Sequence, residues 1–306
     1  MKASTFVAQP PATPGKPPAT HASEYAWFNG ELVLREAGAP SIASINFHLG
    51  TSVFDGMMAY WNGDHHYIHR GEPHFVRFRE GAARMGLSVP WSVEQMLEGT
   101  RQLLAAEGET TQYVRPIAYR RAPELWVTGS EGRPVDVSIF TVRVKREIDT
   151  ALKCHISPVE RISSRSIPGQ IKVSGAYVNS FNARKAAEVA GFQDGIMLDR
   201  EGRVAEASAA NCFVIKGGQL WTPPLNSDVF PGITRQVVLE LARQLGIECV
   251  EQDLRPDDLR GIDGAFLCST LMEIRGLSVL DDQPLGTEEH EIYRALVQAF
   301  RRMTAQ

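Results

Sequence analysis

One lysine of this 306-residue chain stands where a surface charge has no evident use. Lys172 lies in the run IKVSGAYVNS, among β-branched and small residues. Such a lysine can simply lay its aliphatic stem on apolar surface and keep its ammonium group in water. It can also be a desolvated amine that forms a Schiff base with a carbonyl compound. The lysine alone leaves both interpretations open.

Three segments downstream carry further groups that suit a ligand. Glu206, in RVAEASAANCFV, is followed by small residues that let a flat ligand approach the backbone. In VFPGITRQ a Pro-Gly loop precedes a helix that opens at Ile233 and Thr234, and the free N–H groups and positive dipole of a helix start suit a phosphate. FLCSTLMEI places Ser269 and Thr270 in a polar turn. Each segment also has an ordinary structural interpretation, so only their joint occurrence points to a function.

Several other kinds of chemistry are disfavoured by missing motifs. The chain has no GxxxxGK[ST], HExxH or GxSxG, and no GxGxxG after a strand, which argues against nucleotide hydrolysis, zincin chemistry and serine-hydrolase chemistry. His65, His66 and His69 in DHHYIH resemble metal ligands, but neighbouring residues of a strand point to opposite faces. A metal site needs converging ligands, so we expect none here.

Composition indicates an ordinary globular protein. With 43% hydrophobic and 22% charged residues, the chain can build a substantial core and is long enough for two domains. A net charge of -4 gives no reason to expect nucleic acid or a membrane surface as partner. No apolar run approaches the roughly 20 residues that span a bilayer. The four cysteines are widely spaced without a CxxC pair, so we expect reduced thiols in a cytoplasmic protein.

The elements that must position the candidate residues begin after a Pro-, Ala- and Thr-rich arm, residues 1–24, which we predict to be flexible. Residues 25–144 predict a small α+β domain. Hairpin turns are expected at Asn29-Gly30 and Asn62-Gly63, where both central residues of a type I′ turn need positive φ. Helices are expected over residues 72–85 and after the cap Ser92, ending before the glycines at 86 and 108.

The polar residues 145–157 predict a linker, and residues 158–306 predict a second, larger α+β domain. Asn179 or Ser180 should cap a helix that runs through residue 190. Glu-Gly at 201–202 and Gly-Gly at 217–218 should turn two hairpins. Another helix should open at Thr234, and a last amphipathic helix should start near Thr287.

The quoted segments, taken together, resemble the fold-type IV pyridoxal-phosphate enzymes and, within them, the branched-chain aminotransferases. The resemblance runs from Trp27 to the C-terminal helix through WFNGELV, GTSVFDGMMAY, HFVRF, YVRP, KVSGAYVNS, GFQDGIMLDREGRVAEAS, LWTPP, PGITR and CSTLMEI. It implies a two-domain α+β fold with a barrel-like sheet in the larger domain, pyridoxal 5'-phosphate as cofactor, and a homodimer.

The resemblance assigns the cofactor half of a site. Lys172 matches the lysine that bonds to the cofactor aldehyde and shuttles protons, and Glu206 matches the carboxylate that faces the pyridine nitrogen. Tyr177 matches the tyrosine at the cofactor's O3′. Four further residues match groups that bind the phosphate: Arg77, Ile233, Thr234 and Thr270.

The substrate half departs from the family pattern. Leu49 stands where the family has the tyrosine of HYG, and Met58 replaces the arginine of FEGIR. Trp126 and Leu271 occupy places of smaller residues. Four residues follow the pattern of the family, namely Phe54, Gly56, Tyr113 and Arg115. Because each change removes polarity or adds bulk, we predict a substrate pocket more apolar than is usual for the family.

These residues predict an aminotransferase that moves an amino group between a hydrophobic, branched-chain-type L-amino acid and a 2-oxo acid by a ping-pong mechanism. An (R)-selective amine transaminase or a D-amino-acid transaminase is the alternative that the substituted positions favour. A lyase resembling aminodeoxychorismate lyase would share the fold and the cofactor. A binding protein that has lost catalysis would have no need of the charges of Lys172 and Glu206 in an apolar site.

Overall fold

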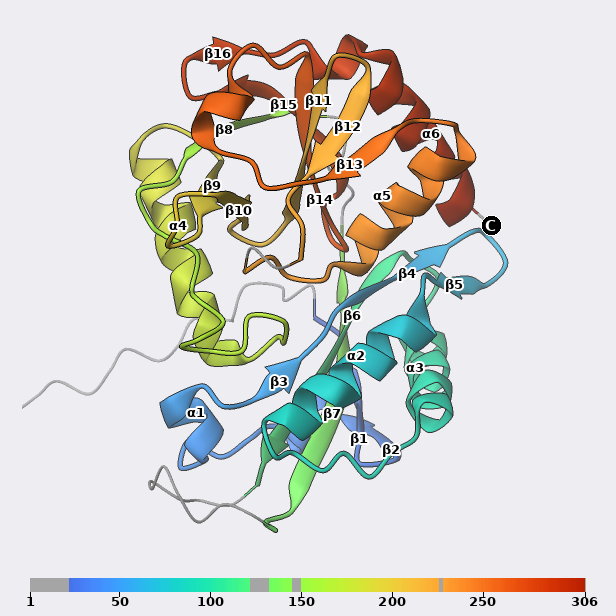
Figure 1. Ribbon diagram of the computed structural model, residues 1–306. Helices are drawn as coiled ribbons and strands as arrows, with labels where there is room; N and C mark the ends of the chain where they lie inside the picture. The colour runs from blue at the N-terminus through green and yellow to red at the C-terminus, as the bar shows by residue number, and fades with distance from the viewer. Residues whose placement is uncertain (1–21, 122–131, 145–149, 226–227, 306) are drawn as a thin grey trace, which may run out of the picture.

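The computed structural model describes residues 22–121, 132–144, 150–225 and 228–305. Its strands form two sheets, one in each of two lobes that lie one above the other in Figure 1. Trp126, residues 1–21 of the predicted arm and residues 145–149 of the predicted linker lie outside the described residues. No helix among the described residues is long and apolar enough to cross a membrane.

The lower lobe in Figure 1 is built on an antiparallel seven-stranded sheet in the order β2-β1-β7-β6-β4-β5, with β3 paired to β6. Its strands are β1 Tyr25–Phe28, β2 Glu31–Leu34, β3 Val53–Phe54, β4 Met57–Trp61, β5 His66–Ile68, β6 Gln112–Arg120 and β7 Val135–Arg143. Its helices are α1 Ile45–Leu49, α2 Gly71–Arg84 and α3 Val93–Glu107, with a 3-10 turn at Arg35–Gly38. The apolar faces of α2 and α3 bury Phe75, Phe78, Met96 and Leu103 against the sheet.

Local signals account for most boundaries in this lobe. Ser92 and Gln95 form the reciprocal capping box that starts α3. Asn29 and Gly30 have φ values of 49° and 99°, which confirms the predicted turn. The prediction at Asn62-Gly63 is wrong in its length, because the connection from β4 to β5 spans residues 62–65. The Asn62 side chain accepts from the backbone N–H groups of residues 64 and 65 and replaces the two-residue turn.

The upper lobe is built on a mixed nine-stranded sheet in the order β10-β9-β8-β15-β14-β11-β12-β13, with β16 paired to β15. The sheet is curled and barrel-like, as expected (Figure 1). Its strands are β8 Leu152–Ile156, β9 Asp194–Leu198, β10 Val204–Ala207, β11 Asn211–Lys216, β12 Gln219–Thr222, β13 Cys249–Glu251, β14 Gly264–Ser269, β15 Glu273–Leu280 and β16 Gln283–Pro284. Its helices are α4 Tyr177–Val189, α5 Ile233–Gln244 and α6 Glu291–Thr304, with 3-10 turns at Ser174–Ala176, Pro256–Leu259 and Thr287–Glu289.

Helices α5 and α6 cover one face of this sheet, and their apolar stripes pack on Phe213 and Phe266, whose rings stack at 5.1 Å. Two predicted helix starts are wrong by a few residues. Helix α4 follows directly from a 3-10 turn and already begins at Tyr177, and α6 begins after His290, whose side chain accepts from the Ile292 N–H. The Gly-Gly turn at 217–218 is confirmed, with both residues at positive φ.

Strand β8 lies inside residues 145–157, which the sequence analysis assigned to a linker, so part of that polar stretch belongs to the large sheet. The domain boundaries themselves stay a prediction. The lobes are joined by polar contacts. Tyr60 Oη donates to Glu273 Oε1 at 3.0 Å, and Arg70 at the start of α2 pairs with Glu240 of α5.

Candidate active site

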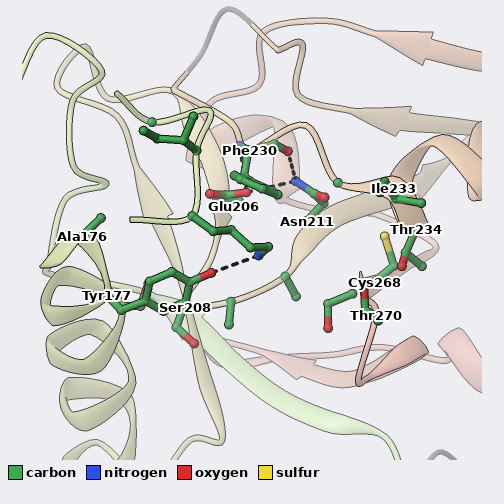
Figure 2. A pocket seen from close by; sticks show the side chains of 18 of the residues that line it. Ala176, Tyr177, Glu206, Ser208, Asn211, Phe230, Ile233, Thr234, Cys268 and Thr270 are labelled. Carbon is green, nitrogen blue, oxygen red and sulfur yellow. Dashed lines mark hydrogen bonds between the residues drawn. The ribbon is translucent and has the colours of Figure 1, made fainter. Parts of the chain in front are cut away.

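Lys172 lies between the lobes and is held by both. The N–H of Phe54 in β3 donates to the Lys172 carbonyl at 3.0 Å, and Val53 forms an isolated antiparallel bridge with Val173. The lysine side chain is half-buried and lines a pocket rather than the outer surface. Its Nζ donates to Tyr177 Oη at 3.0 Å and lies 4.2 Å from the centre of the Phe230 ring (Figure 2). The amine therefore points into the pocket, which favours the chemical interpretation of this residue.

Glu206, on strand β10, is buried and lines the same pocket as Tyr177, beside Phe230 and Asn211 in Figure 2. Its Oε1 accepts from Arg161 Nε at 2.8 Å, and its Oε2 accepts from Asn211 Nδ2 at 3.0 Å and from the Phe230 N–H at 3.1 Å. Burial raises the pKa of the Glu206 carboxyl, while Arg161 and the Phe230 N–H act in the opposite direction. Three donors thus stabilise a carboxylate in a buried position.

The third corner of the pocket suits an anion. Helix α5 begins at Ile233 after Gly232, and no side chain caps its first N–H groups. Thr234 and Thr270 line the same corner, as Figure 2 shows. A Cβ atom on Gly232 would lie 2.1 Å from Asn211 Oδ1, so only glycine allows this close approach of the loop to β11.

Arg77 reaches this corner from the lower lobe. Its Nη1 donates to the Pro231 carbonyl at 3.0 Å, and its guanidinium lies 4.8 Å from the centre of the Phe230 ring. Asp55 accepts from Nε and Nη2 on the other edge of the guanidinium. Nη2 also lies 3.3 Å from His74 Nδ1, whereas Nη1 keeps one N–H that can bind an anion in the pocket.

Together these residues fit pyridoxal 5'-phosphate in the chemistry of their groups. An amine beside a phenol suits the aldehyde and phenolic oxygen, a buried carboxylate suits a protonated ring nitrogen, and a guanidinium with a helix start suits a phosphate. Sequence reasoning placed Lys172, Tyr177, Glu206, Arg77 and the α5 start in one site, and the structure brings all of them together. The sequence did not predict Arg161, Asn211 and Asp55 as site residues. Of these, Asp55 could have been found, because it stands in the FDG motif.

A second cavity shares Lys172 and Tyr177 with the first and is lined by residues of both lobes. Phe54, Met58 and Leu271 line it, as the sequence predicted. So do Tyr113 and Arg115, whose Nη2 donates to Tyr113 Oη at 3.2 Å.

The Arg115 guanidinium lies 4.4 Å from the centre of the Phe54 ring. A Cβ atom on Gly56 would lie 1.7 Å from Tyr113 Oη, so glycine is required for the tyrosine to take this position.

One predicted substrate residue, Leu49, is not among the residues that line this cavity. Leu49 ends α1, is 43% exposed and is absent from the lining of both pockets in the described chain. Trp126 lies outside the described residues. The cavity is also less apolar than predicted. Three arginines that were not expected there line it: Arg143, Arg184 and Arg275.

The histidines of DHHYIH do not converge. His65 lies in the loop before β5, the Nε2 of His66 is 3.0 Å from the Thr110 carbonyl, and His69 is buried among Tyr60, Tyr67 and Phe300. Within the described part of the chain, no three His, Cys, Asp or Glu side chains are arranged to hold a metal ion.

Comparison with known proteins agrees with this geometry. Residues 52–279 match the family model for amino-transferase class IV. The chain is 33% identical to a probable branched-chain-amino-acid aminotransferase of Aquifex aeolicus over 272 residues, which cover 87% of each chain. It is 31% identical to the branched-chain-amino-acid aminotransferase of Salmonella typhimurium, over 87% of this chain and 88% of that one.

Solved structures give the same result. The branched-chain aminotransferase of Thermoproteus uzoniensis, solved with norvaline, has a TM-score of 0.89 and 30% identity, covering 92% of this chain and 95% of its own. The enzyme of Thermobaculum terrenum, solved in its PLP form, has a TM-score of 0.88 and 28% identity, covering 93% and 95%. The matched family model, the close relatives and the shared fold together show that the chain belongs to the class IV aminotransferases.

Proposed function

We propose that this protein is a pyridoxal-phosphate-dependent aminotransferase that moves an amino group between a hydrophobic, branched-chain-type L-amino acid and a 2-oxo acid. The observation that carries the proposal is the Lys172 amine, 3.0 Å from Tyr177 Oη, in one pocket with the buried Glu206–Arg161 pair. The relatives named as branched-chain-amino-acid aminotransferases support the substrate class.

The bound cofactor supplies an aldehyde that takes up the amino group and a ring that withdraws electrons from the substrate's α-carbon. Lys172 Nζ lies in the pocket, where it would hold the cofactor's aldehyde end and could carry a proton during the reaction. Tyr177 Oη accepts from Lys172 Nζ and so orients the amine, and its own O–H could donate to the cofactor's phenolic oxygen. Glu206, whose Oε1 accepts from Arg161 Nε, would face the cofactor's ring nitrogen, and its carboxylate would favour a proton there. Arg77 and the start of α5 would hold the cofactor's phosphate, together with Thr234 and Thr270.

We propose that the substrate cavity binds its ligand through both apolar and cationic side chains. Phe54, Met58 and Leu271 offer apolar surface to a branched side chain. Arg115 and Tyr113 offer donors to a carboxylate. Since a ping-pong enzyme binds donor and acceptor in one pocket, the same walls must accept an aliphatic chain and the carboxylates of the 2-oxo acid.

The test is the absorbance spectrum of the protein loaded with pyridoxal 5'-phosphate, before and after mixing with one amino donor at a time. L-leucine and L-glutamate should each convert the cofactor to its amine form. Conversion by D-alanine or (R)-1-phenylethylamine alone would overturn the proposal in favour of a D-amino-acid or amine transaminase. Pyruvate release without an amino acceptor would indicate a lyase.

Lys172 is tested separately by borohydride reduction of the loaded protein, followed by peptide mass analysis. The cofactor should be fixed on Lys172 and absent from the Lys172→Ala protein. Lys185→Ala, on the exposed side of α4, is the matched control and should label like the unaltered protein. Normal turnover by Lys172→Ala would contradict the assigned role.

We further propose a homodimer formed through an apolar patch on α1 and α4. Phe47 and Leu49 on α1, and Val178 and Phe181 on α4, are exposed large hydrophobic side chains. The two helices are joined where the N–H of Gly175 donates to the Gly50 carbonyl at 2.8 Å. An exposed apolar patch of this kind is typical of a protein interface.

We also propose that the protein works in the cytoplasm. Its four cysteines are free thiols, three of them buried, which suits a reducing compartment.

A further inference from the structure

The cavity beside Lys172 is rich in positive charge. Among its described lining residues, five are cationic and one is a carboxylate. The cations are Lys172, Arg115, Arg143, Arg184 and Arg275, and the carboxylate is Asp194. Arg184 is already paired, since its Nη1 lies 3.4 Å from Asp194 Oδ2 and its Nε lies 3.5 Å from Glu188 Oε1. A cleft lined in this way attracts an anion more strongly than a branched aliphatic chain.

Arg143 and Arg275 are the two arginines of this cavity that have no role in the proposed reaction and, unlike Arg184, no carboxylate partner among the described residues. Arg143 ends β7 in the lower lobe, and Arg275 lies near the start of β15 in the upper lobe. Arg143 Nη2 donates to the Glu107 carbonyl at 3.1 Å, and Arg275 Nε donates to the Thr150 carbonyl at 2.7 Å. Each bond fixes the side chain through a neutral acceptor. Neither guanidinium has a carboxylate partner among the described residues.

Arg115 and Lys172 both lie near the Phe54 ring. The Arg115 guanidinium lies 4.4 Å from the centre of the Phe54 ring, and Lys172 Nζ lies 6.0 Å from the same centre. Arg115 and the reacting amine therefore border the same aromatic ring. Arg143, by contrast, is exposed to solvent, and Arg275 is half-buried.

From this arrangement we propose that Arg143 and Arg275 form a second anion subsite, which binds the distal carboxylate of a dicarboxylic substrate longer than glutamate. The substrate class is an L-amino acid, or its 2-oxo acid, in which the second carboxylate lies at least one methylene farther from the α-carbon. A planar guanidinium binds a carboxylate through two parallel hydrogen bonds. In this subsite each lobe supplies one guanidinium. Met58 and Leu271 supply the apolar wall along which the methylene chain lies. This inference rests on the proposed aminotransferase function and narrows its substrate.

The first test compares matched donors in the half-reaction with the loaded enzyme. L-norleucine and L-2-aminoadipate have the same six-carbon chain and differ in the terminal carboxylate, and L-norvaline and L-glutamate form the same pair with five carbons. We expect kcat/KM for L-2-aminoadipate to exceed that for L-norleucine at least tenfold. In Arg275→Gln and Arg143→Gln this ratio should fall about tenfold each, because a charge-assisted pair is lost. Arg101→Gln, which removes an exposed arginine of α3, carries the same change in net charge and should keep the ratio.

A second test measures binding without chemistry. Adipate and hexanoate are unreactive acids of equal length, and calorimetry on the loaded enzyme gives the Kd of each. Adipate should bind at least tenfold more tightly, and the advantage should vanish in the double variant Arg143→Gln, Arg275→Gln. Equal affinity for the two acids, or an unchanged ratio in the variants, overturns the subsite. If no amino acid converts the cofactor, the aminotransferase proposal itself fails; if L-leucine and L-norvaline react while the ratio stays near one, only the subsite fails.

Discussion

Asp55 holds the guanidinium of Arg77 along one whole edge, with Nε donating to Oδ2 and Nη2 to Oδ1, both at 2.8 Å. The carboxylate is buried and also lies 2.8 Å from His74 Nδ1. Burial alone would raise the pKa of Asp55, but Arg77 and His74 hold it well below its usual range. Asp55 is therefore ionised at any working pH and fixes which edge of Arg77 faces the pocket.

The first prediction concerns this pair. Asp55→Asn should weaken the binding of pyridoxal 5'-phosphate by about 10- to 100-fold, because an unanchored Arg77 no longer presents its free N–H to the phosphate. A titration of cofactor-free protein, followed by absorbance, measures the Kd. Asp64→Asn, in the exposed loop before β5, should bind normally.

A double-mutant cycle completes this test. In an Arg77→Ala background, Asp55→Asn should have no further effect on the Kd of the cofactor, because the two residues act as one unit. A full and independent loss from each substitution would mean that Asp55 acts only through the stability of the lobe.

The second prediction concerns the pH dependence set by Glu206. Burial raises the pKa of its carboxyl and Arg161, with Nε at 2.8 Å, lowers it. In Arg161→Met the lowering contribution is lost, so the pKa of Glu206 rises further and the carboxyl stays protonated to a higher pH. The acid limb of the kcat/KM profile should therefore move to higher pH by about one to three units. Arg161→Lys retains the charge and should move the limb much less. Coincident acid limbs for the unaltered protein and Arg161→Met would show that Glu206 does not control the reaction.

Residues with local signals were predictable from the sequence, and residues defined by long-range contacts were not. Ser92 and Gln95 lie three residues apart, and Gly217 and Gly218 are adjacent, so short-range rules located the α3 start and a hairpin. The two-residue turn predicted at Asn62-Gly63 was wrong, because the Asn62 side chain accepts from the backbone of residues 64 and 65 and forms a longer connection.

The candidate site shows the same division. Lys172, Glu206 and the α5 start lie in recognisable motifs and were found. Arg143 and Arg275 are 132 positions apart in number and carry no motif, and they line one cavity only because strands of both lobes border it. Leu49 matched a motif position, yet the folded chain places it outside the cavity. A motif can identify a residue, but the cavity that the residue lines depends on how the lobes pack.

The third prediction concerns stability at low pH. His69 is buried against Phe300 of α6, and neither of its ring nitrogens has a hydrogen-bond partner among the described residues. Burial, and then the charge of Arg70, lower its pKa from 6.5 to about 4. Between these two values the unfolded chain binds a proton that the folded one does not, so stability falls as the pH drops from about 6.5 to about 4.

Urea unfolding of the unaltered protein and of His69→Phe checks this prediction. Between pH 7 and pH 5 the unaltered protein should lose about 2 kcal/mol more than the variant, whose ring does not titrate. Parallel losses at the two pH values would show that His69 is already protonated in the folded state or accessible to water.

The last prediction concerns the apolar patch on α1 and α4. Phe47 is 71% exposed and Phe181 is 65% exposed, so replacing either by glutamate costs little in the isolated chain. In a dimer that buries them, the added carboxylate would be desolvated without a partner, and such a group destabilises an interface by several kcal/mol. Sedimentation should therefore give twice the chain mass for the unaltered protein and the single-chain mass for Phe47→Glu and Phe181→Glu. Val189→Glu, at the far end of α4 and 83% exposed, adds the same charge outside the patch and should remain dimeric. Dimers in all three variants would place the interface elsewhere on the molecule.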